Sequence, residues 1–392
     1  MQYRTDKYGN RLSVLGFGCM RFQRKQGRID MALAEQQLLQ AFRGGVNYYD
    51  TAYIYPGSEA AIGEIFQKNG IREQLYIATK LPHYLIKSRE SIDKIFAEEL
   101  KRLRTDYVDY YLMHMLTDVA AWERMKSLGI LQWLEEKKKS GQIRQVGFSY
   151  HGGTEEFCKL VDAYDWDFCQ IQYNYMDEHS QAGRRGLYYA HEKGLPLIIM
   201  EPLRGGKLVS GIPESAKKIM EKHSPGYTPA QWAFRWLWDQ PEVTVVLSGM
   251  NSAEMIEDNL QTASACQIGE LGEPEQQMLQ QVVKAINAKM KVGCTGCGYC
   301  MPCPKGVNSP GTFANYNRHY QEGWFPALRE HFMGTALRNR SAAAYNCVGC
   351  GKCEQHCPQG LEIRKHLKEA SKTLEGPIYR IATKVAKWVT KF

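Results

Sequence analysis

A carboxylate and a phenol stand five residues apart in the stretch 45–55, at Asp50 and Tyr55. The residues before Asp50 are apolar and aromatic, which is typical of a buried parallel strand. Two later apolar runs end in Lys80 and His114. Active sites of parallel α/β folds lie at the carboxyl ends of the strands. These four side chains therefore predict a proton-handling site, whereas each one alone would be read as a structural ion pair or a packed core residue.

Eight cysteines between Cys294 and Cys357 form a second chemical group, in two runs. The later run has the bacterial ferredoxin spacing C-x₂-C-x₂-C-x₃-C-P, and the earlier run has two residues before its last cysteine. In two-cluster ferredoxins the fourth cysteine of each run binds the other cluster. The expected [4Fe-4S] ligand sets are Cys294, Cys297, Cys300 and Cys357 for one cluster, and Cys347, Cys350, Cys353 and Cys303 for the other. Zinc stays the alternative, although zinc ribbons use two cysteines per knuckle.

Composition excludes several classes of protein. The chain has 392 residues, of which 44% are hydrophobic and 23% charged, as in ordinary globular proteins. No run of 18 apolar residues predicts a transmembrane helix, and the first residues lack a signal-peptide pattern, so we expect a cytoplasmic protein. The net charge is +8. Half of this net charge lies in residues 371–392. The rest of the chain lacks a basic stripe of the kind that binds nucleic acid.

Short apolar runs alternate with helical patterns over the first 272 residues. The predicted strands are Val14–Gly18, Val46–Tyr49, Leu75–Thr79, Val108–Met113, Ile143–Ser149, Phe168–Gln172, Leu197–Met200 and Val243–Leu247. The predicted helices are Asp30–Arg43, Ser58–Lys68, Ser88–Leu103, one long helix ending near Lys139, Thr154–Ala163, Gly183–Glu192, Pro229–Asp239 and Ser252–Ala263. Eightfold alternation favours a closed (β/α)₈ TIM barrel over a doubly wound sheet. No Gly-x-Gly-x-x-Gly opens a helix after the first strand, which argues against a Rossmann fold.

The predicted domains are therefore a barrel over residues 1–272 and a second region over residues 273–392. The second region comprises a helical linker, a small ferredoxin-like iron–sulfur domain and a basic amphipathic C-terminal helix. That helix places Ile378, Ile381, Val385, Trp388, Val389 and Phe392 on one side. Packing on the protein itself is the ordinary outcome for such a helix. Docking of an electron carrier and binding to a membrane surface are the alternatives.

Residues 1–270 resemble the aldo-keto reductase family. The segments that carry the resemblance are Gly16-Phe-Gly-Cys-Met-Arg21, Gly45-Val-Asn-Tyr-Tyr-Asp-Thr-Ala52, Gly141-Gln-Ile-Arg-Gln-Val-Gly-Phe-Ser149 and Gln170-Ile-Gln-Tyr-Asn174. The resemblance implies hydride transfer between NAD(P)(H) and a small carbonyl or alcohol substrate, with a catalytic tetrad of Asp50, Tyr55, Lys80 and His114. Tyr55 would donate the proton, Lys80 would lower the pKa of that phenol, Asp50 would hold Lys80 charged, and His114 would orient the carbonyl.

The same resemblance implies where the nucleotide binds. The implied contacts are Gly18, Cys19 and Met20 after the first strand, Ser149 and Gln170 at the carboxamide, Met200 beside the ring, Leu203, Gly205 and Lys207 over the pyrophosphate, and Ser248, Gly249, Asn251, Asp258 and Asn259 at the adenosine end. Members that prefer NADPH usually carry Lys or Arg near that last loop, to pair with the 2′-phosphate. This loop has none, so NADH and NADPH both stay open.

The two kinds of cofactor imply different electron chemistry. Nicotinamide moves two electrons as hydride, whereas a cubane cluster moves one electron at a time. The clusters would therefore serve as structural staples, as redox sensors, or as a link to a one-electron carrier such as ferredoxin or a flavoprotein. The alternative function is a redox-sensing nucleotide-binding subunit without significant carbonyl turnover.

Overall fold

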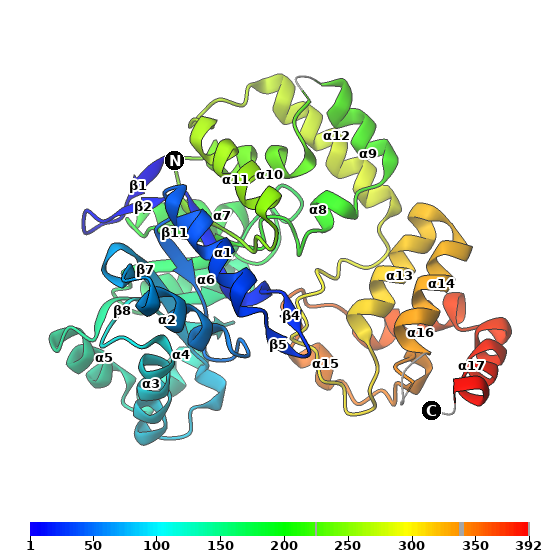
Figure 1. Ribbon diagram of the computed structural model, residues 1–392, viewed down its shortest axis with the longest axis horizontal. Coiled ribbons are helices and arrows are strands. Elements are labelled where there is room, and N and C mark those ends of the chain that lie inside the picture. Colours follow the sequence, from blue (N-terminus) through cyan, green and yellow to red (C-terminus); the bar gives the residue numbers. More distant parts are fainter. Residues whose placement is uncertain (224–225, 337–340, 391–392) are drawn as a thin grey trace. The chain divides into compact units, whose positions relative to one another are not determined.

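The computed structural model describes residues 1–223, 226–336 and 341–390, and Figure 1 shows the arrangement of its elements. The chain divides into two compact units. The first comprises Met1–Pro202 and Ala230–Glu273, and the second comprises Leu203–Pro229 and Pro274–Phe392. The segment 203–229 therefore interrupts the first unit in sequence while grouping with the cysteine region.

Eight parallel strands of the first unit close into a barrel. They are β3 (Leu15–Gly18), β6 (Tyr48–Asp50), β7 (Tyr76–Leu81), β8 (Val108–Leu116), β9 (Ile143–Tyr150), β10 (Phe168–Gln172), β11 (Leu197–Met200) and β12 (Val243–Ser248). The strands follow one another around the barrel in chain order, and β12 pairs with β3 to close it. The eight predicted strands and the predicted closed barrel are confirmed.

Helices connect the strands, largely as predicted. In the first unit they are α1 (Met31–Arg43), α2 (Ser58–Lys68), α3 (Arg89–Leu103), α4 (Val119–Ser127), α5 (Ile130–Lys139), α6 (Thr154–Asp162), α7 (Gly183–Glu192), α10 (Pro229–Trp238) and α11 (Ala253–Ala265). Asp30 and Ser252 cap α1 and α11 through their side chains. The prediction of one long helix ending near Lys139 was wrong, because Gly129 adopts a φ of 81° and separates α4 from α5.

Short hairpins and large side chains complete the barrel. Strands β1 (Tyr3–Thr5) and β2 (Arg11–Ser13) form one hairpin, and β4 (Arg24–Lys25) and β5 (Arg28–Ile29) form another. Inside the barrel, Tyr48 and Tyr110 meet edge to face with their ring centres 5.1 Å apart. The interior is a packed core rather than a channel, so side chains that handle protons are confined to the strand ends.

The second unit is mostly helical. Its helices are α8 (Lys207–Ser210), α9 (Glu214–Lys222), α12 (Glu273–Lys289), α13 (Ser309–Glu322), α14 (Trp324–Thr335), α15 (Lys352–Gln355), α16 (Ile363–Leu374) and α17 (Pro377–Thr390). Its core contains Phe313 and Tyr316 of α13 and Leu367 and Leu374 of α16, and six of the eight clustered cysteines pack against it. The thiols therefore lie at the edge of a hydrophobic core.

Helix α17 forms as predicted, but its apolar stripe is not packed on the protein. Ile378, Ile381 and Val385 are 64%, 63% and 55% exposed. The side chains of Trp388 and Val389, and the whole of Phe392, lie outside the described residues. The expected packing of this helix on the protein itself is made through Tyr379 and Thr383, which are buried, while the aliphatic residues face solvent. Among the described residues, no helix is long and apolar enough to cross a bilayer.

Gly63 lets α2 and α3 pack with their backbones in contact, which yields a stability prediction. A Cβ at Gly63 would lie 2.3 Å from the carbonyl oxygen of Arg102. Gly63→Ala should lower the free energy of unfolding by about 1–3 kcal/mol, since backbone cannot move aside as a flexible side chain can. Urea unfolding followed by circular dichroism measures this. The control is Gly153→Ala, where a Cβ meets nothing within 4 Å; equal effects of the two variants would contradict the close packing.

Candidate active site and cysteine centre

Neighbouring strand ends bring the four predicted proton-handling residues to one mouth of the barrel. Asp50 is the last residue of β6, Lys80 lies near the end of β7, and His114 lies near the end of β8. Tyr55 follows in the loop between β6 and α2, and it is half-buried, while the other three side chains are buried. The structure therefore groups all four residues as the sequence predicted.

Lys80 and Asp50 form a buried ion pair. Lys80 Nζ lies 2.6 Å from Asp50 Oδ1 and donates a second hydrogen bond to the carbonyl of Thr51 at 2.6 Å. The other carboxylate oxygen of Asp50 accepts from Gln170 Nε2 at 2.9 Å. Multiple hydrogen bonds of this kind are what a buried charge pair requires to offset the loss of solvent.

Tyr55 and His114 lie beside this ion pair. Lys80 Nζ is 5.3 Å from the centre of the Tyr55 ring. The rings of Tyr55 and His114 meet edge to face with centres 6.0 Å apart. Burial lowers the pKa of His114 well below its ordinary value, and the Lys80 ammonium lowers it further. His114 is therefore neutral at physiological pH, and its ring can donate a hydrogen bond without carrying charge.

A network of buried polar groups that the sequence analysis missed holds the Tyr55 loop. Ser58 Oγ donates to the carbonyl of Cys19 at 2.8 Å. Glu59 accepts from Thr79 Oγ1 at 2.6 Å and pairs with Arg102 at 3.2 Å. Arg102 also donates to the carbonyl of Tyr53 at 3.2 Å. The loop is thus fixed from the sides of β7 and α3, through contacts too distant in sequence for any local pattern to indicate.

Two further histidines follow the ends of β7 and β9, and sequence analysis did not single them out. Burial lowers the pKa of His83 and of His151 to about 4. His151 Nδ1 lies 3.2 Å from the Gln181 side-chain oxygen. In their charged form, both histidines would lower the pKa of His114. The mouth is thus lined by neutral imidazoles, which are visible in the sequence only as single histidines after strands.

Ser149 and Gln170, the residues predicted at the carboxamide, are register partners on β9 and β10. Both are buried. Ser149 Oγ accepts from the backbone N–H of Met115 at 2.8 Å, which leaves its hydroxyl proton available for a ligand. Met200 ends β11 beside Gln172. A hydroxyl donor next to an amide suits recognition of a carboxamide, so these residues fit the predicted ligand.

The predicted adenosine end lies around the carboxyl end of β12. Asn259 Nδ2 donates to Ser248 Oγ at 3.1 Å, and the carbonyl of Asn251 accepts from Gln23 at 2.6 Å. Asp258 accepts from Gln231. Gly18 ends β3 at this edge, followed by Cys19, which is buried, and Met20, which is exposed.

Arg21 is the residue that sequence analysis missed at this end. A Cβ built on Gly249 would lie 3.3 Å from Arg21 Cδ, so the arginine chain runs beside that glycine. Its guanidinium lies 3.6 Å from a carboxylate oxygen of Glu201. The positive charge of Arg21 therefore lies beside the Ser248–Asn251 loop, although the two are far apart in the sequence.

Leu203, Gly205 and Lys207, the predicted pyrophosphate contacts, belong to the second unit. Lys207 Nζ donates to the carbonyl of Cys294 at 2.6 Å, and Arg204 donates to the carbonyl of Gly293 at 3.1 Å. These basic side chains therefore hold the backbone at the start of the cysteine loop.

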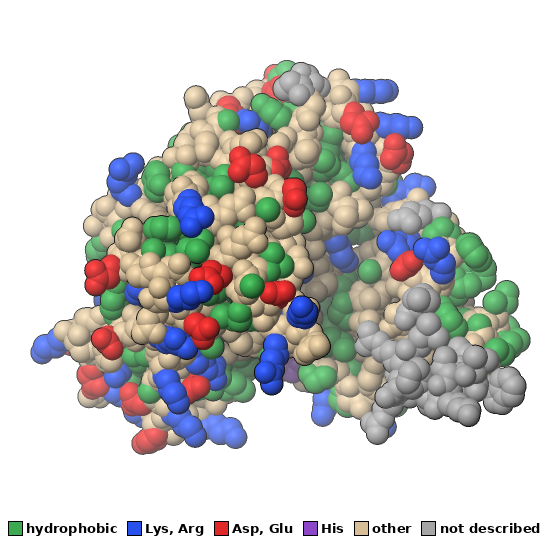
Figure 2. Space-filling model, in the orientation of Figure 1, with side chains coloured by type: hydrophobic (Ala, Val, Ile, Leu, Met, Phe, Trp, Pro, Cys, Tyr) green, Lys and Arg blue, Asp and Glu red, His purple; other side chains and the backbone are tan. Residues whose placement is uncertain are grey.

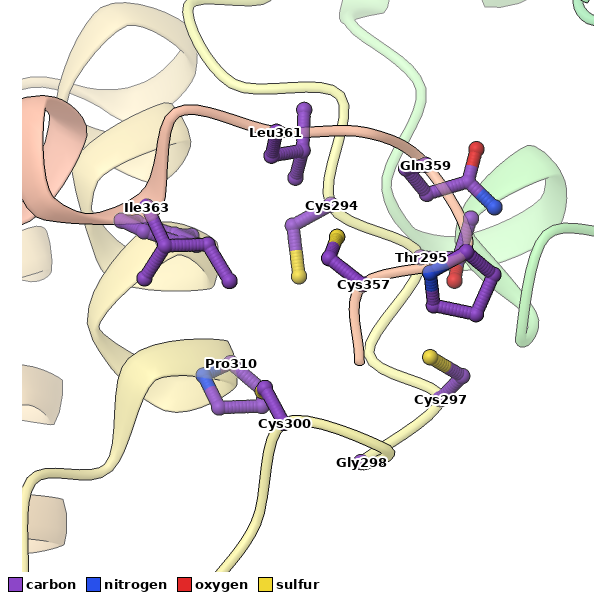
Figure 3. Close-up of a pocket in the computed structure, with 12 residues that line it drawn as sticks. Cys294, Thr295, Cys297, Gly298, Cys300, Pro310, Cys357, Gln359, Leu361 and Ile363 are labelled. Atoms are coloured by element: carbon purple, nitrogen blue, oxygen red, sulfur yellow. The ribbon is translucent and has the colours of Figure 1, made fainter. Parts of the chain in front are cut away.

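Four cysteines line one cavity in the second unit, as Figure 3 shows. They are Cys294, Cys297, Cys300 and Cys357, which is the first ligand set that the sequence predicted. The cavity wall also contains Phe313 and Leu361. Cysteines from the two runs thus meet across a mainly apolar hollow, in the crossed arrangement of two-cluster ferredoxins.

The chemistry of this cavity fits an iron–sulfur cluster. Burial, together with the neighbouring thiolates of Cys294 and Cys297, raises the pKa of the Cys300 thiol to about 12. Metal binding offsets such a penalty, because thiolates are the ligands. Thr295 also lines the cavity, is buried, and has a hydroxyl that finds no hydrogen-bond partner among the described residues. A cluster sulfur would give that hydroxyl an acceptor.

The second predicted ligand set is grouped less tightly. Cys303, Cys347 and Cys353 pack against the same hydrophobic core, whereas Cys350 is exposed. The Cys347 thiolate contributes to raising the pKa of Cys353, which places these two near each other. Within the described ranges, no three His, Cys, Asp or Glu side chains stand close enough to hold a single metal ion.

Comparison with family models identifies both parts of the chain. Residues 14–282 match the model of the aldo/keto reductase family. Residues 293–361 match the model of the 4Fe-4S dicluster domain. The ferredoxin-like interpretation of the cysteine runs is thereby confirmed over zinc.

Individual relatives agree with the first match. An aldo-keto reductase of Mycolicibacterium vanbaalenii is 31% identical over 260 residues, which span 64% of this chain and 82% of that protein. The L-glyceraldehyde 3-phosphate reductase of Escherichia coli O157:H7 is 27% identical, over 67% of this chain and 87% of its own length. Among solved structures, an aldo-keto reductase from Bacillus halodurans in its holo form shares the fold, with a TM-score of 0.59, 23% identity, and coverage of 73% of this chain and 97% of its own.

The buried histidines predict how stability depends on pH. His151 has a pKa of about 4 in the folded protein against about 6.5 in an unfolded chain. Between these values the unfolded chain binds a proton that the folded state does not, so stability falls as the pH falls through this window. His151→Gln should weaken this dependence by up to about 1.4 kcal/mol per pH unit. Urea unfolding at several pH values measures it. The matched control is His191→Gln, at an exposed position on α7; identical slopes for the two variants would refute the role of His151.

Proposed function

We propose that this chain, which belongs to the aldo/keto reductase family and carries a 4Fe-4S dicluster domain, transfers hydride between a nicotinamide nucleotide and a small carbonyl or alcohol compound. The observation that carries the proposal is the grouping of Tyr55, Lys80, Asp50 and His114 at the barrel mouth. The ammonium of Lys80 lies beside the Tyr55 ring, where it favours the phenolate and so makes the phenol a stronger acid.

In this proposal each of the four residues has a separate task. Tyr55 donates the proton to the developing alkoxide at its phenol oxygen. Lys80 keeps that phenol acidic, and Asp50 holds Lys80 in place beside it through the buried ion pair. Neutral His114 orients the substrate carbonyl by donating a hydrogen bond. The network through Glu59 and Arg102 fixes the loop that carries Tyr55.

The nucleotide would supply the hydride. Ser149 and Gln170 would hold its carboxamide, and Ser248, Asn251, Asp258 and Asn259 would line its adenosine end. Arg21 beside Gly249 offers a charge-assisted partner for a 2′-phosphate, which supports NADPH as the better ligand. Glu201 competes for the same guanidinium, so NADH remains a second ligand in this proposal.

The dicluster domain would hold two [4Fe-4S] clusters with crossed ligands. Cys350 and its neighbour Val348 are exposed, which supports exchange of single electrons with an outside carrier such as ferredoxin or a flavoprotein. Arg204 and Lys207 place positive charge beside the first cysteine loop, where it favours thiolates. Thiolate ligands require a reducing compartment, so we place the reaction in the cytoplasm.

Replacing the proposed proton donor tests the reductase function. Tyr55→Phe should lower turnover of small aldehydes with NADPH by about 100-fold or more, because the donor is gone. Binding of NADPH, followed by fluorescence titration, should stay unchanged. The matched control is Tyr188→Phe, an exposed phenol on α7.

Two outcomes would contradict this proposal. Retained turnover in Tyr55→Phe would remove Tyr55 from the proton-donor role. Tight nucleotide binding by the unmodified protein with no turnover on any carbonyl would instead favour the redox-sensing subunit.

Metal analysis tests the dicluster proposal. Anaerobically purified protein should contain about eight irons and about eight sulfides per chain. Cys297→Ser should remove about four of each. The control is Cys158→Ser on α6, outside the two runs. Zinc in place of iron would refute the ligand assignment, and so would an equal loss of iron and sulfide in the control variant. Electron exchange would be refuted if no reductant reversibly bleached the absorbance of the clusters.

A further inference from the structure

The outward side of α17 presents aliphatic side chains to solvent. Ile378, Ile381 and Val385 recur at spacings of three and four residues, which places them along one side of the helix. All three are more than half exposed. Figure 2 shows hydrophobic side chains along the edge of the second unit that carries α17. Isolated exposed aliphatic residues are common, but a continuous row on one helix marks a binding surface.

A row of basic residues runs beside this stripe. Arg380 and Lys384 are both exposed and lie one position before Ile381 and Val385. The sequence continues the two rows with Lys387 and Trp388, whose side chains lie outside the described residues. No Asp or Glu follows Glu375 in the chain. The helix therefore combines an aliphatic row with a charged row of one sign.

The orientation of α17 is fixed from its buried side. Tyr379 and Thr383 are buried, and Tyr379 Oη lies 2.8 Å from Thr335 Oγ1 of α14. Just before the helix, Glu375 is buried, binds His331 at 2.8 Å and accepts from the backbone N–H of Ala344 at 2.7 Å. Polar and aromatic groups thus hold one side of the helix against the unit. The aliphatic stripe cannot turn inward without breaking these bonds.

We propose that α17 docks the protein on an anionic phospholipid surface. The aliphatic row would enter the boundary between headgroups and acyl chains, and the basic row would meet lipid phosphates, as in interfacial amphipathic helices. A second copy of the chain fits less well, since pairing two such helices brings two rows of positive charge together. An acidic protein partner would have to cover the same aliphatic row, and a protein that binds no vesicle would point to such a partner instead. The proposal is independent of the hydride chemistry and goes beyond it.

Vesicle sedimentation of the full-length protein with its clusters tests the proposal. The protein should sediment with phosphatidylcholine–phosphatidylglycerol vesicles at low salt. Its binding to vesicles of phosphatidylcholine alone should be weaker by about tenfold or more, and high salt should release it from the anionic vesicles. The double variant Ile381→Asn with Val385→Asn should lower binding by about tenfold or more. Lys384→Glu should also weaken it, because it reverses one charge of the basic row.

Matched controls distinguish binding through α17 from nonspecific adsorption to vesicles. Ile268→Asn removes an equally exposed aliphatic residue from the first unit, and Lys218→Glu makes the same charge change on α9. Both should bind like the unmodified protein, and iron content verifies that every variant is folded. Equal binding to neutral vesicles, no sedimentation at low salt, or equal effects of the control variants would overturn the proposal. So would a concentration-dependent dimer that the double variant abolishes, since the face would then belong to a second copy.

Discussion

The buried pairing of Lys80 with Asp50 is the interaction on which the rest of the site depends. Two charges taken out of water cost several kcal/mol each, and they are tolerated only where hydrogen bonds satisfy both. Asp50 comes from β6, Lys80 from β7, and Gln170 from β10 on another part of the barrel. These partners meet only when the sheet is closed. Closure of the barrel is therefore a condition for this set of hydrogen bonds around Asp50 and Lys80.

Burial explains the state of the surrounding histidines. It lowers the pKa of His114, His83 and His151, and the Lys80 ammonium lowers the pKa of His114 further, because a positive charge in a poorly solvated site disfavours a second one. Neutral imidazoles donate hydrogen bonds without competing for the negative charge that develops on a reacting oxygen. A neutral imidazole at His114 suits the role proposed for that residue, which is to orient a carbonyl through a hydrogen bond.

The local sequence pattern was enough to predict the barrel and the residues at its strand ends, because the period of the strands, the helix caps and the order of the elements in the chain determine both. It failed where contacts join residues far apart in sequence. Arg21 meets Gly249 across most of the chain, and Arg102 reaches the Tyr55 loop from α3. The aliphatic stripe on α17 is a further example. The spacing around Ile381 predicts which residues share a helix face, but it does not predict whether other residues cover that face. The grouping of Cys357 with the cysteines of the earlier run was predictable, because the spacing of the runs matches that of two-cluster ferredoxins.

The segment 203–229 makes the two units of the chain interleave in sequence. It leaves the barrel three residues after the end of β11 and returns to it in α10. Between those points Arg204 and Lys207 donate hydrogen bonds to the carbonyls of Gly293 and Cys294. The segment that follows β11 is thus fixed to the start of the cysteine loop, and neither unit is a single continuous stretch of chain.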